Sequence, residues 1–178
     1  MSIPNVLSIF RLLLSGVFVV VFFSDHPNAL TYSALIYLLA GITDVLDGII
    51  ARKFNMITKL GKILDPAADK IMTFCVFICI AIKGIIPAWA VIILFCKELV
   101  LSVGGLTMYK KINNVFSSNL LGKAATVSFV VSGISIMLFN DNLPEYLKYT
   151  LITISLVLTI SSLGSYMYKL IKLWGSKE

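Results

Sequence analysis

The sequence predicts an all-α polytopic membrane protein with six transmembrane helices. Hydrophobic residues make up 58% of the 178 residues and charged residues only 13%. Soluble domains contain roughly 45–50% apolar and about 25% charged residues. The mean hydropathy is +0.96. The apolar residues gather in six stretches, and a membrane-spanning helix needs roughly 20 largely apolar residues. The length fits a single domain over 1–178.

The six expected helices follow one another with short breaks between them. They cover residues 9–23, 30–50, 61–82, 87–109, 120–139 and 146–170. Three of the breaks, SDHPN, KGIIP and NDNLP, contain the Pro, Gly and Asn residues that end helices and form turns. The residues that precede Arg11, SIPNVLSIF, are expected to form a short amphipathic lead-in along the membrane surface.

The basic residues predict the orientation of these helices. Lys and Arg concentrate in the second and fourth connections and in the C-terminal tail, whereas the opposite side holds Lys83 and Lys148 beside acidic residues. Because cytoplasmic loops carry the excess of Lys and Arg, both termini are expected to be cytoplasmic. The net charge of +6 then fits contact with anionic lipid headgroups. Nucleic-acid binding is not expected, since no basic stripe with interleaved aromatics is present.

Four of the nine acidic residues lie in one short stretch, TDVLDGIIARKFNMITKLGKILDPAADK. Asp44 and Asp47 are three positions apart at the end of the helix over 30–50. Asp65 and Asp69 are four positions apart at the start of the helix over 61–82. Each pair shares one helix face. If the two helices pack as antiparallel neighbours, four carboxylates converge at the cytoplasmic edge, where they need protons, cations or bound metal.

Bound metal is the interpretation we favour. Carboxylate oxygens suit hard divalent ions such as Mg2+ or Mn2+, and two such ions roughly 3.5–4 Å apart form a clamp for displacement at phosphorus. Gly48 and Gly61 would let a phosphate-bearing ligand approach the backbone beside the carboxylates. Two alternatives are open. A cation carrier would use the carboxylates as a transport site, although such sites usually lie near the midplane. A purely structural network would pair them with Arg52, Lys59, Lys62 and Lys70.

The aspartates belong to a longer pattern, Asp44-x-x-Asp47-Gly48-x-x-Ala51-Arg52, eight residues, then Gly61-x-x-x-Asp65-x-x-x-Asp69. This pattern resembles the signature of the CDP-alcohol phosphotransferase family at every fixed position, and six membrane helices are the family architecture. The resemblance implies transfer of the phosphatidyl group of CDP-diacylglycerol to a glycerol-type acceptor, with release of CMP. It also implies two divalent cations, Mg2+ or Mn2+, a homodimer, and a site on the cytoplasmic side of the bacterial cytoplasmic membrane.

The resemblance also assigns roles to residues. Asp69 is the expected general base, and the two metals are held by Asp44, Asp47, Asp65 and Asp69. The residues expected around the cytidine diphosphate are Asn5, Asp47, Gly48, Ala51, Arg52, Gly61 and Asp65. Candidates for binding the acceptor or its phosphate are Arg11, Lys97, Lys110 and Lys123. For Asn5 and Arg11 an alternative is open, in which they cap and anchor the first helix.

Two acceptors fit the family pattern, glycerol-3-phosphate and phosphatidylglycerol. The opening IPNVLSIFR is similar to both branches. The chain has Lys97-Glu98 where glycerol-3-phosphate enzymes typically carry Arg-Glu, and Ala125 where they carry a second Lys. A phosphomonoester dianion favours several cations and bidentate donors, so these departures favour phosphatidylglycerol, as in cardiolipin synthases. Because phosphatidylglycerophosphate synthases are the commoner bacterial members, we expect glycerol-3-phosphate and keep phosphatidylglycerol as the alternative.

Overall fold

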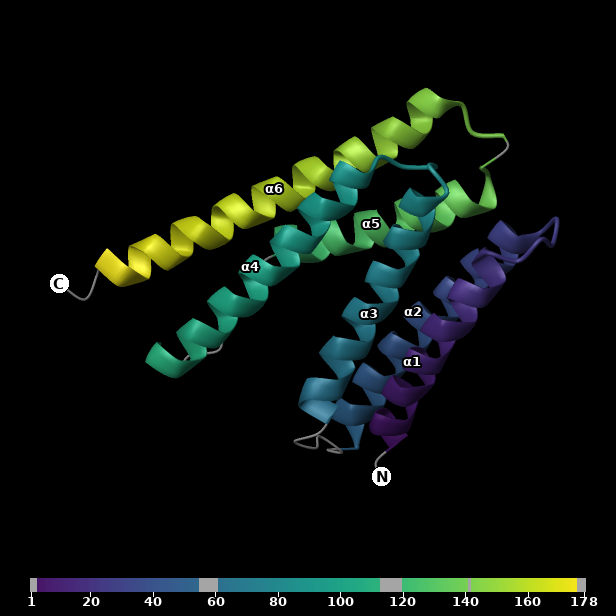
Figure 1. The fold of residues 1–178 in the computed structure, drawn as a ribbon. Coiled ribbons are helices and arrows are strands. Elements are labelled where there is room, and N and C mark those ends of the chain that lie inside the picture. Colours follow the sequence, from purple (N-terminus) through teal and green to yellow (C-terminus); the bar gives the residue numbers. More distant parts are fainter. Residues whose placement is uncertain (1–2, 55–60, 113–119, 141, 176–178) are drawn as a thin grey trace. The chain divides into compact units, whose positions relative to one another are not determined.

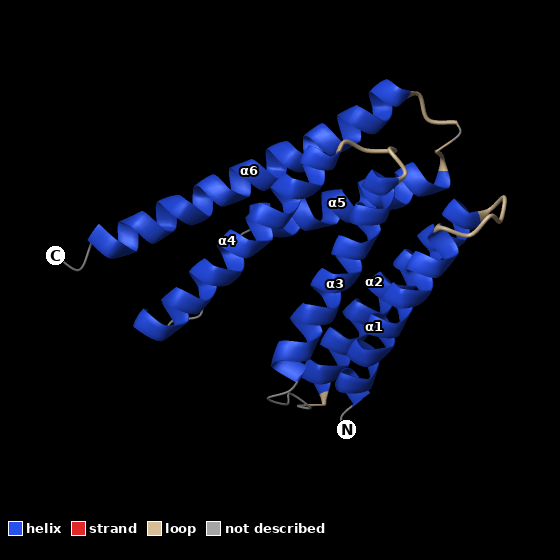
Figure 2. Ribbon diagram, in the orientation of Figure 1, coloured by secondary structure: helices blue, strands red, loops and turns tan. Residues whose placement is uncertain are grey.

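A computed structural model of the chain describes residues 3–54, 61–112, 120–140 and 142–175. Within these ranges the chain forms helices joined by turns, and no strand occurs (Figure 2). The all-α prediction is therefore confirmed for this part of the chain. The helices, labelled in Figure 1, are α1 (Ile3–Phe22), α2 (Ala29–Lys53), α3 (Gly61–Ile82), α4 (Ala88–Ile112), α5 (Leu120–Leu138) and α6 (Glu145–Gly175).

The first helix is longer than the sequence pattern predicts. Residues 3–10, expected to form a lead-in along the membrane surface, form the first turns of α1 in one continuous helix. Pro4 does not interrupt it, because a proline in the first turn of a helix removes an N–H that has no partner there. This continuity places Ser8 and Arg11 on one rigid element, three positions apart and so on the same face.

Three helical stretches of the described residues are long and apolar enough to cross a membrane. They are Asn5–Phe22, Ala29–Ile50 and Glu145–Ser165. A further apolar stretch, Ala124–Leu138, is shorter. The first turns of α3 contain charged residues, among them Asp65, Asp69 and Lys70, which lowers its average hydropathy. The six-span topology and the cytoplasmic termini stay predictions.

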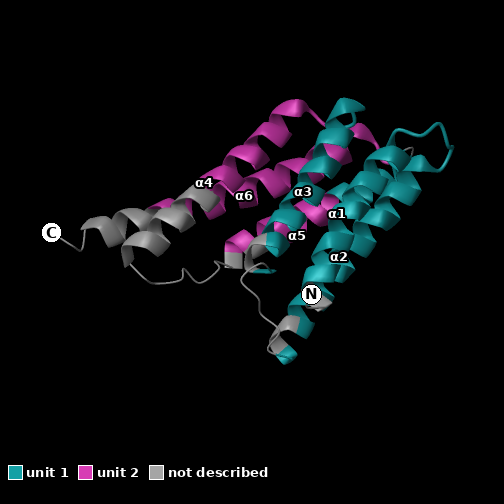
Figure 3. Ribbon diagram, turned by 60° about the horizontal axis from the view of Figure 1, so that its bottom comes forward, with its two compact units in different colours: residues 1–85, 133–142 teal, residues 86–132, 143–178 magenta. Residues whose placement is uncertain are grey.

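The chain divides into two compact units (Figure 3). Unit 1 comprises residues 1–85 and 133–142, and unit 2 comprises residues 86–132 and 143–178. The single domain expected from the length stays a prediction. In unit 1, α1 packs along both α2 and α3, whereas α2 and α3 make few direct contacts with each other. The start of α1, the end of α2 and the start of α3 lie at the same end of this unit (Figure 1).

The far end of α1 is tied to α3 by a lysine. Lys83 Nζ donates to the carbonyl oxygen of Phe22 at 2.7 Å and lies 4.6 Å from the centroid of the Phe22 ring. The last carbonyls of a helix have no intrahelical partner and favour a nearby cation. The core beside this contact contains the fully buried side chains of Phe18, Phe22, Phe77 and Ile80. The α1–α3 contact is thus supported away from the aspartates.

Unit 2 contains a helix contact built from small and hydroxyl residues. Ser155 on α6 lies 2.7 Å from the Ser128 hydroxyl and 3.0 Å from the Ser132 hydroxyl of α5. A Cβ added to Gly122 would lie 3.2 Å from Ser162 Oγ. Small residues let membrane helices approach closely, and hydroxyls then bond across the contact. These hydroxyls therefore have a structural explanation within the helix pair.

Candidate functional site

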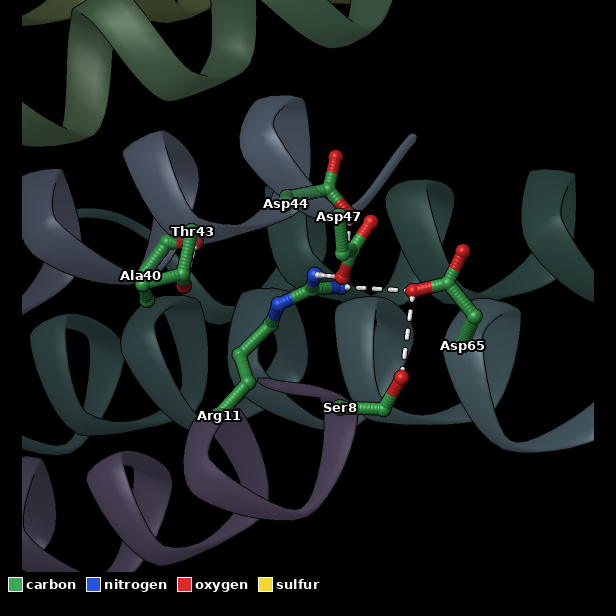
Figure 4. A network of polar contacts seen from close by, with 7 residues as sticks. All are labelled: Ser8, Arg11, Ala40, Thr43, Asp44, Asp47 and Asp65. Atoms are coloured by element: carbon green, nitrogen blue, oxygen red, sulfur yellow. Dashed lines mark hydrogen bonds and ion pairs between the residues drawn. The ribbon is translucent and has the colours of Figure 1, made fainter. Parts of the chain in front are cut away.

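Three of the four aspartates meet at one point of unit 1 (Figure 4). Asp44 and Asp47 project from the end of α2 and Asp65 from the second turn of α3. One carboxylate oxygen of each lies within 4.8 Å of the others. The spacing of three positions places Asp44 and Asp47 on one face of α2. The structure therefore brings together carboxylates from the two helices that the sequence pattern singles out.

An arginine from α1 lies among these carboxylates. Arg11 Nη1 lies 2.5 Å from Asp44 Oδ1 and 3.4 Å from Asp65 Oδ1, and Nη2 lies 2.5 Å from Asp47 Oδ2. The hydroxyl of Ser8, one turn earlier, donates to the same Asp65 oxygen at 3.5 Å. One guanidinium thus contacts carboxylates from two different helices.

The sequence interpretation missed this arrangement. It expected direct packing of the second and third helices to bring the carboxylates together, and it named basic residues close in sequence as their possible counterions. In the structure α1 packs against both helices, and Arg11 supplies the cation from a distant part of the chain. One signal was available: an arginine within an apolar helix requires an internal partner, and carboxylates are the strongest partners for its planar fork.

The group formed by Arg11, Asp44, Asp47 and Asp65 has a buried side and an exposed side. The side chains of Arg11 and Asp47 are 1% and 2% exposed, whereas those of Asp44 and Asp65 are 41% and 42% exposed. In Figure 4 the carboxylate oxygens that do not contact Arg11 point away from α1. The exposed carboxylates of the group are therefore Asp44 and Asp65, and Arg11 and Asp47 form its buried side.

The donor set of this group fits a divalent metal ion. Among the side chains that the structure describes here, three carboxylates face one guanidinium, an excess of two formal negative charges, and such an excess in a partly buried place favours a cation. Oxygen-only donors are the ligands that Mg2+ and Mn2+ prefer. Asp44 and Asp65 are open enough to admit an ion from solvent.

The fourth aspartate lies outside this group. Asp69 follows Asp65 by one turn of α3, and its side chain is exposed. Asn5 is 7% exposed on α1, Gly48 directly follows Asp47, and Gly61 is the first residue of α3. The other two residues predicted near the nucleotide are Ala51 and Arg52. They lie in the last turn of α2, and their side chains lie outside the described residues.

The lysines predicted for the acceptor belong to unit 2. Lys97 on α4 is 2% exposed, and its Nζ lies 2.7 Å from Glu98 Oε1. Lys110 on α4 and Lys123 on α5 have side chains outside the described part of the structure. A role in acceptor binding stays a prediction for all three.

Comparison with known proteins gives consistent relationships. Residues 1–161 match the family described as CDP-alcohol phosphatidyltransferase. A CDP-diacylglycerol--glycerol-3-phosphate 3-phosphatidyltransferase of Wigglesworthia glossinidia brevipalpis is 32% identical over 172 residues, which are 94% of each chain. The protein of the same name from Rickettsia bellii is 38% identical over 101 residues, 57% of this chain and 56% of the relative. A protein named "Putative cardiolipin synthase" from Mycobacterium bovis is 34% identical over 138 residues. The alignment covers 78% of this chain and 65% of the mycobacterial protein.

Proposed function

Because the chain belongs to the CDP-alcohol phosphatidyltransferase family, we propose that it is a membrane transferase of glycerophospholipid synthesis. It transfers the phosphatidyl group of CDP-diacylglycerol to the hydroxyl of a glycerol-type acceptor and releases CMP. The observation that carries this proposal is the meeting of Asp44, Asp47 and Asp65, whose carboxylate oxygens lie within 4.8 Å of one another. These residues lie at fixed positions of the pattern that resembles the family signature.

The aspartates have distinct tasks in this proposal. Asp44, Asp47, Asp65 and Asp69 would hold two divalent cations, Mg2+ or Mn2+, which would supply positive charge against the pyrophosphate and the departing CMP. Asp44 and Asp65 offer partly exposed oxygens on the accessible side of the group. Asp47 offers a carboxylate that burial holds in one place.

The transfer moves one proton and exchanges one bond at phosphorus. The acceptor hydroxyl oxygen forms a bond to the phosphorus that carries the diacylglycerol group, and the bond from that phosphorus to the CMP oxygen breaks. Asp69 accepts the hydroxyl proton. Its exposed position on α3, one turn from Asp65, suits a base that must reach an incoming substrate.

The nucleotide is held by small residues and one fixed cation. Gly48, Ala51 and Gly61 present little side chain and let the cytidine diphosphate approach the backbone. Arg52 forks onto a phosphate, since a guanidinium donates two parallel hydrogen bonds to such an oxyanion. Asn5 lines the same site from α1. The phosphate-binding role predicted for Arg11 stays a prediction, because its guanidinium contacts three carboxylates here.

Glycerol-3-phosphate is the acceptor we propose, which makes the protein a phosphatidylglycerophosphate synthase. The relative that aligns over 94% of both chains is named for glycerol-3-phosphate. Lys97, Lys110 and Lys123 would hold its phosphate. Phosphatidylglycerol is the second candidate, supported by the similarity to the mycobacterial protein and by Ala125 in place of a second lysine.

The membrane setting follows from the same chemistry. Six spans with both termini cytoplasmic would place the aspartates at the cytoplasmic edge of the bacterial membrane, within one domain over 1–178 and in a homodimer. There the acyl chains stay in lipid while the nucleotide stays in water.

Purified protein in lipid nanodiscs tests the proposal. Radiolabelled CDP-diacylglycerol is offered with glycerol-3-phosphate or with phosphatidylglycerol, in Mg2+, in Mn2+ or in EDTA. We expect metal-dependent phosphatidylglycerophosphate and CMP. Cardiolipin as the only product would replace the acceptor by phosphatidylglycerol. Metal uptake into liposomes with no lipid product from either acceptor would reject the transferase in favour of a cation carrier.

A further inference from the structure

We propose that Arg11 is a positioning residue, whose guanidinium holds one oxygen of each of three carboxylates from the buried side and leaves their other oxygens aimed at metal. The inference rests on the proposed function, since it presumes that these aspartates bind divalent cations. It gives Arg11 a task different from binding a substrate phosphate.

The contacts show why one guanidinium can do this. Arg11 reaches Asp44 and Asp47 on α2 and Asp65 on α3 with two of its nitrogens. The fork is planar and rigid, so it fixes directions as well as distances. Because α2 and α3 make few direct contacts, the separation of Asp47 and Asp65 depends on the helix that lies against both. That helix is α1, which contacts all three carboxylates through Arg11 and Asp65 also through the Ser8 hydroxyl.

The exposure of the side chains places Arg11 behind the group. The guanidinium is 1% exposed, while Asp44 and Asp65 are open to solvent on the other side. The three oxygens that Arg11 does not contact point away from α1 (Figure 4). An ion that enters from solvent would meet the exposed Asp44 and Asp65 carboxylates before the buried Asp47. Arg11 would then orient the ligands as outer partners of metal sites do.

The charges of the three carboxylates also require a cation beside them. Carboxylates whose oxygens lie within 4.8 Å of one another repel when they are partly removed from water. Without a cation behind them they turn apart or take up protons, and either change hinders metal binding. Among the described side chains of this site, Arg11 compensates one of three carboxylate charges, so these carboxylates would still attract a dication. The guanidinium stays in this place although its Nε has no hydrogen-bond partner among the described residues.

Three variants test the inference. Arg11→Met removes both the positive charge and the planar set of N–H donors. Arg11→Lys keeps the charge but removes the planar guanidinium. Lys83→Met is the matched control, because it deletes one cation that joins α1 to α3 at Phe22, away from the carboxylates. The Mn2+ dissociation constant is measured by electron paramagnetic resonance of free Mn2+, and thermal stability is measured in EDTA.

We expect Arg11→Met to weaken Mn2+ binding about ten- to hundredfold, the usual effect of removing an outer partner of a metal ligand. Arg11→Lys should recover part of the loss. Lys83→Met should lower stability and bind Mn2+ as the wild type does. Unchanged affinity in Arg11→Met would reduce Arg11 to a structural role, and tighter binding would make it a competitor of the metal; either result overturns the inference. A wild type that binds no Mn2+ would instead reject the metal site of the proposed function.

A measurement on the wild type covers the case in which Arg11→Met does not fold. Phenylglyoxal labelling of Arg11 is quantified by peptide mass spectrometry with and without Mn2+, and in SDS-unfolded protein as the fully labelled reference. We expect Arg11 to stay protected in both conditions, because it lies behind the ligands. A rise in Arg11 labelling on Mn2+ addition would show displacement by the metal and overturn the inference.

Discussion

Replacing Asp47 by asparagine removes the most buried carboxylate of the group at almost unchanged size. Asp47 is 2% exposed and lies 2.5 Å from a guanidinium that is 1% exposed. A hydrogen bond to a charged group contributes about 1.5–3 kcal/mol. We assign the Arg11–Asp47 contact a value near the upper end of this range, because it is short and shielded from solvent. The Asp65 contact is longer, 3.4 Å, and this side chain is 42% exposed, where an ion pair contributes about 1 kcal/mol or less. Asp47→Asn should therefore lower the unfolding free energy by about 2 kcal/mol more than Asp65→Asn.

The measurement is reversible unfolding by SDS in mixed micelles with EDTA present, so that bound metal does not contribute. Asp25→Asn is the control, because it makes the same chemical change at an exposed residue outside the helices. It should leave the unfolding free energy almost unchanged. Equal losses in Asp47→Asn and Asp65→Asn would refute the reasoning from distance and burial.

Other consequences concern catalysis, topology and the acceptor. Asp69→Asn should abolish transfer at saturating Mg2+ or Mn2+ and lower metal-free stability less than Asp47→Asn, since Asp69 is exposed; activity like that of the wild type would contradict its role as the base. In a cysteine-free background, a cysteine at position 55 should react only from the cytoplasm and one at position 28 only from outside, and the reverse labelling would refute the orientation. Lys123→Ala should raise the KM for glycerol-3-phosphate roughly ten- to hundredfold and leave the KM for CDP-diacylglycerol unchanged; equal changes in both constants would count against an acceptor contact. Ala125→Lys should unfold at lower temperature than the wild type, because Ala125 is fully buried and an unpaired ammonium there is costly; unaltered stability would show that the lysine side chain escapes to solvent.

The helices were predictable because their signals are local. Apolar stretches and the Pro, Gly and Asn residues between them mark six helices, and all six are present among the described residues; α3 has the expected bounds and the other five have shifted ends. The largest shifts lie in α1, which begins at Ile3, and in α6, which extends to Gly175. Polar residues at a helix end make a boundary hard to read, since they occur both in the last turn and in the loop that follows.

The sequence by itself determined which carboxylates can share a face, because spacing along a helix is a property of the backbone repeat. Asp44 and Asp47 follow this rule, and they meet Asp65 as the pattern indicates. Only the tertiary structure decided that Arg11 joins the group and that Asp69 lies outside it. The counterion of a buried charge depends on which helix packs beside it, and that choice arises from contacts along the whole length of α1. No local pattern encodes such a choice, so the cation on the buried side of the aspartates is visible only in the folded chain.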